Sequence, residues 1–159
     1  MARRIDPATL PAITGTKYPP PYDEPCHTRQ RTRLGDAAGL TQFGVNLLRL
    51  PPGAWSAQRH WHTNEDEFIW VLSGEIMLVT DAGAEVLRPG DCAGFKAGNP
   101  DGHHLQNRSD ADATVLEVGM RHPGGDTGYA SDCDLIGLPN GTYAHRDGTP
   151  YPEQPRRSG

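Results

Sequence analysis

Glycine and proline constrain this chain more than any other feature of its sequence. Nineteen glycines and fifteen prolines are spread over 159 residues, and both residue types break helix interiors. They follow no collagen-like period, and we find no longer internal repeat. We therefore expect a turn-rich all-β domain, and the length suits one domain with a core of its own.

The composition divides the chain into three parts. Residues 1–40 are rich in proline and polar residues, and we expect an extended N-terminal arm that lies along the surface of the domain. Residues 41–122 carry the strand signals and are expected to form the barrel core. Residues 123–159 are again rich in glycine and proline, which predicts a C-terminal extension that packs on the barrel and ends in frayed residues.

The central part contains eight short segments with strand character, separated by turn residues. These segments are residues 42–50, 57–62, 67–72, 75–80, 84–87, 92–96, 103–107 and 114–121. Short strands at such regular spacing favour a sandwich or a small barrel. In the C-terminal extension, residues 142–145 are a candidate for one further short strand.

The strand expected at residues 67–72 has large apolar residues on both of its faces. Phe68, Trp70 and Leu72 alternate with two smaller apolar residues, so one set faces the core and the other faces outward. An exposed row of this kind needs a cover, which either the N-terminal arm or a second subunit must supply. We expect a homodimer through the face that carries Phe68, Trp70 and Leu72.

Charge and cysteine content exclude several classes of partner. The formal net charge is −5, whereas nucleic-acid binding needs a clustered cationic face. No apolar run is long enough to span a membrane, and the N-terminus has no secretory signal. Three cysteines without CxxC spacing do not suggest a disulfide framework or a cysteine-based zinc site. We therefore expect a cytoplasmic protein with a small-molecule ligand and with neither nucleic acid nor membrane as partner.

The strongest local signal for chemistry is the sequence His60-Trp61-His62, followed by Glu67. Residues two apart on a strand point the same way, so both imidazoles face one space. Glu67 begins the next strand and can return a carboxylate to the same place. Two imidazoles and a carboxylate suit Zn, Fe, Mn, Ni or Co. Taken alone, the pattern also fits a surface histidine pair without a metal.

A later histidine pair strengthens the prediction of a metal site. His103 and His104 open the strand expected at residues 103–107. His103 shares a face with Leu105 and Asn107, whereas its neighbour points the other way. His103 is therefore the predicted fourth ligand, and His104 is kept in reserve.

These residues and their order resemble the two sequence motifs of the cupin superfamily. Residues 53–74 read Gly-x6-His-Trp-His-x4-Glu-x6-Gly and are similar to the first motif, G-x5-HxH-x3,4-E-x6-G. Residues 90–107 read Gly-x7-Gly-x4-His-x3-Asn and are similar to the second, G-x5-PxG-x2-H-x3-N. Lys96 stands where the second motif has proline, and the loop before its histidine is longer. The resemblance extends over residues 43–120.

The resemblance implies a cupin-type jelly-roll β-barrel with extended arms at both ends. It assigns His60, His62, Glu67 and His103 to the metal site of the family, and the layout of the chain is similar to small bacterial cupins loosely described as sugar-phosphate-isomerase-like. Three neutral imidazoles and one carboxylate leave a divalent ion with net positive charge and with open coordination positions. Catalytic metal sites, unlike structural ones, keep such positions open.

Other residues are weaker candidates. Gln58 shares a face with His60 and, with His104 and Asn107, is a candidate to line the cavity. Glu117 lies in the middle of a strand among apolar neighbours. There it is either a general base with a raised pKa or one half of a structural hydrogen-bonded pair.

Three functions from different classes remain open. The first is a metal-dependent enzyme that acts on a small polar metabolite by isomerase, lyase or oxygenase chemistry. The second is a non-catalytic module that binds or senses a small molecule at the same site. The third is a metal-free barrel that serves as an interaction domain, and the metal content separates it from the other two.

Overall fold

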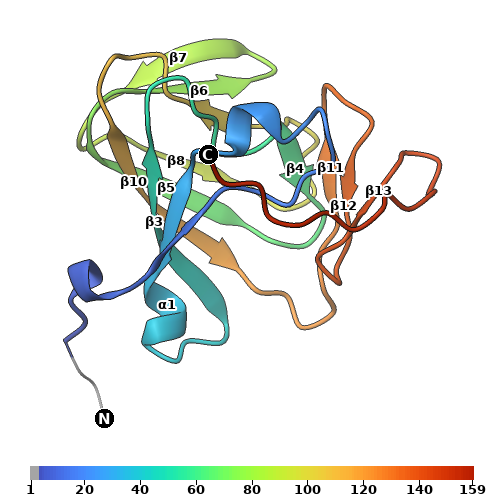
Figure 1. Ribbon diagram of the computed structural model, residues 1–159, viewed down its shortest axis with the longest axis horizontal. Helices are drawn as coiled ribbons and strands as arrows, with labels where there is room; N and C mark the ends of the chain where they lie inside the picture. Colours follow the sequence, from blue (N-terminus) through green and yellow to red (C-terminus); the bar gives the residue numbers. More distant parts are fainter. Residues whose placement is uncertain (1–3) are drawn as a thin grey trace.

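Short antiparallel strands in three sheets make up most of the regular secondary structure of the computed structural model, which describes residues 4–159 (Figure 1). The largest sheet has six strands, in the order β1 (Ala12–Thr14), β2 (Gln30–Arg33), β3 (Phe43–Leu50), β10 (Ala113–Met120), β5 (Glu67–Ser73) and β8 (Cys92–Phe95). A second sheet contains β7 (Gly83–Leu87), β6 (Ile76–Thr80) and β9 (His104–Gln106). The third contains β13 (Tyr143–Ala144), β12 (Ile136–Gly137), β11 (Gly128–Ala130) and β4 (His60–His62). The predicted all-β class is confirmed.

Helices are few and short in the described residues. They are α1 (Leu34–Ala37) and the 3-10 helices η1 (Pro7–Thr9) and η2 (Glu24–Cys26). Within residues 4–159, no helix has the length and apolar character that a membrane crossing requires.

The core lies between the six-stranded and the three-stranded sheets. Strand β10 pairs along its whole length with β3 and on its other side with β5. Val115 opposes Leu48 and Val71 across these three strands, and all three point inward because side chains alternate along a strand. The main core side chains are Leu48, Leu50, Ile69, Val71, Ile76, Leu78, Leu105 and Val115.

The eight strands predicted for the central part correspond to β3 through β10, with ends that differ by one to three residues. The largest difference is at β4, where a strand is expected from residue 57 and begins only at His60. Just before it, the backbone bonds to two other segments: Trp55 N donates to Pro25 O, and Ser56 N donates to Leu105 O. These separate contacts hold the segment without a continuous ladder.

The N-terminal segment does more than lie along the surface. Residues 1–3 of the predicted arm lie outside the described residues, but β1 and β2 extend the large sheet beyond β3. Thr16 and Cys26 are fully buried. The strand β2 has the sequence Gln-Arg-Thr-Arg, which lacks apolar alternation, so its backbone pairing with β3 and not its own pattern makes it a strand.

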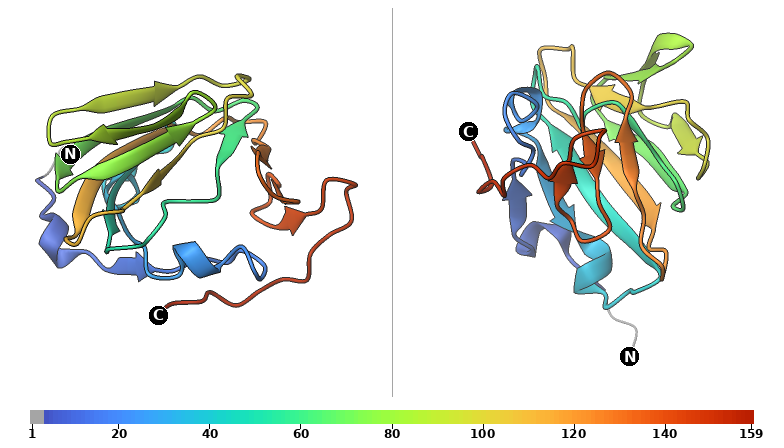
Figure 2. Two further views of the ribbon diagram at one scale, coloured as in Figure 1. Left: turned by 90° about the horizontal axis from the view of Figure 1, so that it is seen from above. Right: turned by 90° about the vertical axis from the view of Figure 1, so that its right-hand side faces the viewer.

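The C-terminal residues expected to fray are tied to this N-terminal segment (Figure 2). Thr16 N donates to Arg157 O at 3.1 Å and Arg157 N returns a bond to Thr16 O at 2.8 Å. The guanidinium of Arg157 binds Asp23 at 2.9 Å. Gly15, with φ +89°, makes the approach possible, because a Cβ there would lie 1.8 Å from Arg157 O. The strand candidate at residues 142–145 is present as β13.

The outward row of β5 is not covered by the N-terminal segment. Phe68, Trp70 and Leu72 are 38%, 48% and 46% exposed. The same face continues over β10 and β3, where the outward side chains are Leu116, Val118, Met120, Phe43, Val45 and Leu47. The sequence left two candidates to cover this face, the N-terminal arm and a second subunit. Because the described part of the arm does not cover it, the second subunit is the remaining candidate.

We propose that a second copy of the chain packs on this face. Strand β8 lies beside β5 and continues the face, and four adjacent strands of up to eight residues give it an area on the order of 500 Å². Two copies would thus bury roughly 1,000 Å², the lower bound for a specific interface. The centre of the face is apolar, and ion pairs mark its two ends. Arg49 binds Asp112 at one end and Arg121 binds Asp36 at the other. An apolar centre inside a polar rim is typical of a protein–protein interface.

The substitution Trp70→Glu tests this interface, because it places a charge in the centre of the apolar face. We expect the wild-type protein to have the mass of a dimer in light scattering and the variant to have the mass of a monomer. Tyr129→Glu is the control, since Tyr129 is 36% exposed on the four-stranded sheet. A monomeric wild-type protein would contradict the proposal.

Candidate metal centre

Four side chains meet at one end of the barrel, where β4, β5 and the start of β9 come together. His60 and His62 project from β4, and Glu67 is the first residue of β5. His103 precedes β9 and is joined to His60 by two backbone hydrogen bonds of 2.9 and 3.2 Å. This isolated bridge places residues far apart in the sequence side by side.

The donor atoms of His60, His62 and Glu67 converge on one point, and that of His103 lies against Glu67. His60 Nε2 lies 3.0 Å from His62 Nε2, which lies 3.3 Å from Glu67 Oε2. The same Glu67 oxygen lies 2.9 Å from His103 Nε2. Of the four predicted ligands, the structure thus groups His60, His62 and Glu67, and it places His103 beside Glu67. His60, His62 and Glu67 form a group whose donor atoms all lie within 4.8 Å of one another.

Hydrogen bonds to the opposite ring nitrogens fix the tautomers of the two strand histidines. His60 Nδ1 lies 2.7 Å from the carbonyl oxygen of Gln58, which only accepts, so this nitrogen carries the proton. His62 Nδ1 binds the carboxylate of Asp126 and is a donor for the same reason. In the neutral form of each ring, Nε2 therefore has a lone pair and no proton.

These tautomers leave the centre in need of a cation. Two lone pairs of His60 and His62 and the charge of Glu67 face one another at 3.0–3.3 Å, which is repulsive unless a proton or a metal ion lies between them. Neutral imidazoles whose second nitrogen donates to an oxygen are the usual ligands of divalent transition metals. The donor set therefore fits a metal ion. His103 is held by its ring stack on Phe95, with 3.5 Å between centroids.

The ionisation of the group agrees with this electrostatic picture. Burial acts to lower the pKa of His62, but the carboxylates of Glu67 and Asp126 outweigh it and raise the pKa to about 9. Burial lowers the pKa of His60 to about 3. Burial opposes ionisation of Glu67, but hydrogen bonds from His103 and His62 hold its pKa well below the usual range. In the metal-free protein at neutral pH, one proton on His62 thus serves as the cation.

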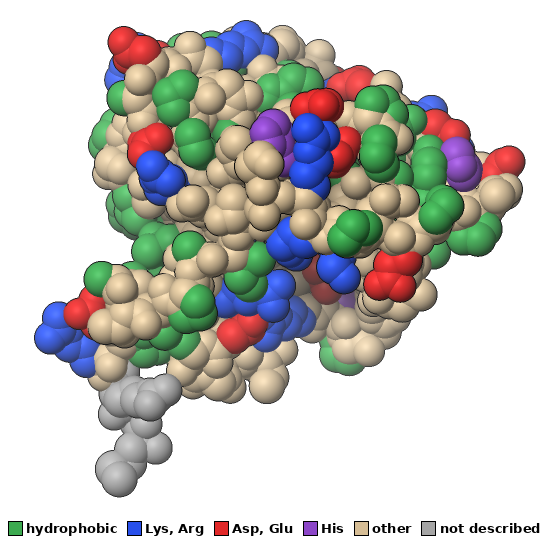
Figure 3. All heavy atoms as spheres, in the orientation of Figure 1, with side chains coloured by type: hydrophobic (Ala, Val, Ile, Leu, Met, Phe, Trp, Pro, Cys, Tyr) green, Lys and Arg blue, Asp and Glu red, His purple; other side chains and the backbone are tan. Residues whose placement is uncertain are grey.

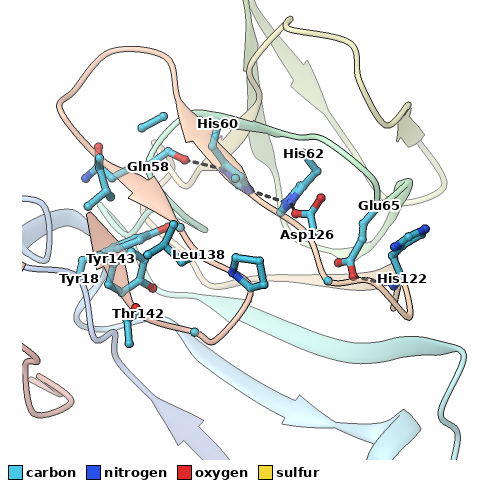
Figure 4. A pocket seen from close by; sticks show the side chains of 17 residues that line it. Tyr18, Gln58, His60, His62, Glu65, His122, Asp126, Leu138, Thr142 and Tyr143 are labelled. Carbon is cyan, nitrogen blue, oxygen red and sulfur yellow. Dashed lines mark hydrogen bonds and ion pairs between the residues drawn. The ribbon is translucent and has the colours of Figure 1, made fainter. Parts of the chain in front are cut away.

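Three cavities open onto this centre, and His60 and His62 both form part of the wall of two of them. The barrel cavity, of about 510 Å³, lies against the inner face of the large sheet and also contacts Glu67 and His103. The outer cavity, of about 430 Å³, lies beneath the C-terminal extension. In Figure 4, Tyr143 lies across the outer cavity from His62.

The weaker lining candidates occupy different places. Gln58 lines the outer cavity and donates from Nε2 to Tyr22 O at 2.8 Å. His104 is buried and its Nδ1 lies 2.9 Å from Ala57 O, and the residue forms part of the wall of the barrel cavity, as expected.

Asn107 has a structural role. It is 1% exposed, and its amide nitrogen donates to Leu50 O and Ala111 O at 2.7 Å. Its side chain closes the turn after β9 and lines neither cavity. Sequence reasoning grouped it with the site because alternation places it on the face of His103, but alternation does not show how far along the strand the cavity extends.

Glu117 is one half of a structural hydrogen-bonded pair, the second of the two roles expected for it. Its two carboxylate oxygens accept hydrogen bonds from Arg31 Nε at 2.8 Å and Arg31 Nη2 at 2.9 Å. A carboxylate held in this bidentate pair is not free to take a proton from a substrate.

Two acidic residues of the site were missed by sequence reasoning. Asp126 comes from the loop between β10 and β11, where it binds His62 and accepts from Thr63 Oγ1 and Asn64 N. Glu65 lies in the turn between β4 and β5, and it forms a second acidic group with His62 and Asp126. No spacing rule connects Asp126 to the histidine pair, because only the folding of the C-terminal extension brings them together.

Comparisons with known proteins identify the family. The sequence profile of the cupin domain matches residues 46–119. A crystal structure named as a sugar phosphate isomerase from a cupin superfamily, from Silicibacter pomeroyi, is 44% identical, with a TM-score of 0.88 over 94% of this chain and 97% of that chain. A putative sugar phosphate isomerase from Acidithiobacillus ferrooxidans is 28% identical, with a TM-score of 0.68 over 74% of this chain and 75% of that one.

More distant similarity shows the fold alone. The polyketide cyclase RemF from Streptomyces resistomycificus is 19% identical, with a TM-score of 0.63 over 77% of this chain and 82% of that one. No curated protein matches the chain. One fold supports unrelated chemistries, so the fold by itself does not decide the reaction.

Metal binding is predicted to depend on pH through His62. Below its pKa of about 9 the metal-free ring is protonated, and a metal ion must displace that proton. The affinity for Zn²⁺ should therefore rise about tenfold per pH unit up to that pKa and then level off. Calorimetry in buffers of different ionisation enthalpy should detect about one proton released per ion at neutral pH. A pH-independent affinity would contradict the assignment of His62.

The substitution Asp126→Asn tests the role of the carboxylate behind His62. It removes the charge that fixes the tautomer of the ring, and loss of such a partner typically costs about 10- to 100-fold in metal affinity. Asp132→Asn is the matched control, because Asp132 lies in the same extension but binds Arg59. Equal Zn²⁺ affinities in the two variants would contradict the assigned role.

Proposed function

This chain belongs to the cupin superfamily, and we propose that it is a divalent-metal-dependent enzyme that acts on a small polar metabolite. The observation that carries this proposal is the convergence of His60 Nε2, His62 Nε2 and Glu67 Oε2 between two cavities. A structural metal site would be enclosed by its ligands on all sides. Here the ligands form part of cavity walls, which leaves room for a substrate beside an ion such as Zn, Fe, Mn, Ni or Co.

The ion would be held by His60, His62, Glu67 and His103. When bound, a divalent ion polarises carbonyl and hydroxyl oxygens and stabilises negative charge that develops on them. The chain's part is to keep each ring in the correct tautomer and position. The carbonyl of Gln58 does this for His60, and the carboxylate of Asp126 does it for His62.

Isomerase chemistry is the form of the proposal that the relatives favour. The Silicibacter pomeroyi protein named as a sugar phosphate isomerase is similar over nearly the whole chain. Exchange of a carbonyl group with a neighbouring hydroxyl needs a base that removes a proton from one carbon and returns it to the next. The base must have a free oxygen atom that faces the substrate cavity.

Glu65 meets this requirement. Its Oε1 accepts from His122 N at 2.8 Å, its other oxygen has no partner within residues 4–159, and it lines both cavities. The other carboxylates of the barrel cavity are all bound to basic or histidine side chains, namely Asp36, Glu67 and Glu117. We therefore assign proton transfer to Glu65, in place of the earlier candidate Glu117.

Elemental mass spectrometry on protein purified without a metal-affinity resin tests the metal site. We expect about one equivalent of a transition metal in the wild-type protein and none in the His60→Ala/His62→Ala variant. His145→Ala is the control, because His145 pairs with Asp134 in the C-terminal extension outside the group of ligands. No metal in the wild-type protein, even after incubation with divalent ions, would favour a metal-free interaction domain.

Turnover is tested with the metal-loaded protein and a panel of aldose and ketose phosphates in D₂O, followed by proton NMR. Exchange of a carbon-bound proton for deuterium reports the proton-transfer step. Glu65→Gln should lower the rate by about 100-fold or more and keep the metal content. Saturable binding without exchange would instead favour a binding or sensing module, and full activity of Glu65→Gln would remove Glu65 from the proton-transfer role.

A further inference from the structure

The wall of the barrel cavity contains a buried positive charge without a carboxylate partner. Arg29 is 8% exposed, and its guanidinium donates only to neutral oxygens, those of Gly15, Ser56 and Thr16. Within residues 4–159 no acidic side chain lies at ion-pair distance from it. Burial, followed by the positive charge of Arg31, lowers the pKa of Arg29. Buried charges are normally paired, so an anion bound beside Arg29 would supply the missing partner charge.

A second guanidinium lies beside it and keeps one nitrogen free. Arg31 Nη2 and Arg29 Nη1 both donate to the carbonyl oxygen of Ser56, while Arg31 Nε and Nη2 bind Glu117. The Nη1 atom of Arg31 has no partner in the described residues. The side chain of Arg31 is 27% exposed, and it forms part of the wall of the barrel cavity.

The neighbouring strand β3 contributes the side-chain amide of Asn46 to the same cavity wall. Asn46 of β3 is paired with Glu117 of β10 on one side and with Arg33 of β2 on the other. Arg31 lies on the same face of β2, two residues before Arg33. The row of Glu117, Asn46 and Arg33 faces the barrel interior, since the next row contains the core residue Leu48. Asn46 lines the barrel cavity, and its amide has no hydrogen-bond partner within residues 4–159.

We propose that these groups form an oxyanion subsite for the substrate of the proposed enzyme, on which this inference rests. Arg31 Nη1 and the amide of Asn46 bind a carboxylate or phosphate group, and the charge of Arg29 adds to the attraction. The cavity that they line also contacts His60, His62, Glu67 and His103. A substrate that bridges the two ends is thus a small anion with a carbonyl or hydroxyl group at its other end.

The charges of this wall support an anionic ligand. Glu117 neutralises one guanidinium and holds it in a fixed orientation by a bidentate bond. The second guanidinium, that of Arg29, has no carboxylate at ion-pair distance within residues 4–159, and a bound divalent ion would add positive charge at the ligand group. Figure 3 shows basic side chains gathered around the central hollow of the molecule, with acidic side chains beside them. A cavity of about 510 Å³ is within the usual range for small-molecule sites.

The subsite is tested by titration of the ¹⁵N-labelled protein with inorganic phosphate and with malonate, and with glycerol as the neutral probe. Both anions should shift the Nε–H resonance of Arg31, and glycerol should leave it unchanged. The double variant Arg31→Gln/Glu117→Gln removes the guanidinium without leaving a buried unpaired carboxylate. We expect it to bind the anions about tenfold more weakly or worse, as expected for loss of a charge-assisted hydrogen bond.

The matched control is Arg49→Gln/Asp112→Asn, which removes a similar pair on the outer face of the same sheet. It should keep the wild-type affinity for both anions. The wild-type Arg31 resonance gives a result even where the double variant fails to fold. Tighter binding of phosphate or of malonate identifies the group that the subsite prefers, and either result supports it.

Two results would overturn the subsite. One is an unchanged anion affinity in a folded Arg31→Gln/Glu117→Gln protein. The other is an anion that shifts the resonances of the histidine ligands and leaves Arg31 Nε–H in place, which would locate it at the metal centre. Titration of the metal-free protein separates this test from the proposed function, because the arginine groups remain there when the metal or the turnover is absent.

Discussion

The pairing of β10 with β3 and β5 is the constraint on which the rest of this structure depends. It fixes which side chains enter the barrel, and the character of the inward row changes along the strand. Val115 packs in the core, whereas Glu117, two residues later, faces the polar end and binds Arg31. The outward row stays apolar, with Leu116 opposite Trp70. One ladder thus sets the core, the substrate cavity and the proposed dimer face.

At the polar end of the barrel, hydrogen bonds to one nitrogen of a histidine ring determine the protonation and direction of the other nitrogen. Gln58 and Asp126 bind the Nδ1 atoms of His60 and His62 and thereby direct the opposite nitrogens inward. The result is a group of electron pairs whose repulsion a cation relieves. His60, His62 and Glu67 lie on strands, whereas Gln58 and Asp126, which orient the two rings, come from the segments between strands.

The two terminal segments supply what the central barrel lacks. From the N-terminal segment come Arg29, Arg31 and Arg33, three of the basic side chains that line the barrel cavity. From the C-terminal extension come Asp126 and much of the wall of the outer cavity. Arg157 ties the end of the extension to Thr16, so the two segments stabilise each other. The family profile matches residues 46–119, so Arg29, Arg31 and Asp126 lie outside the matched range.

The sequence by itself determined the all-β class, the eight central strands and the grouping of His60, His62 and Glu67. It could do so because side-chain alternation and the His-x-His spacing are local properties of a strand. Only the tertiary structure decided that Glu117 is bound to Arg31 and that Asp126 stands behind His62. These contacts join segments far apart in the chain, and a polar residue in a local pattern does not reveal its distant partner. Strand β2 is a further example, because its sequence lacks apolar alternation and only its backbone pairing with β3 makes it a strand.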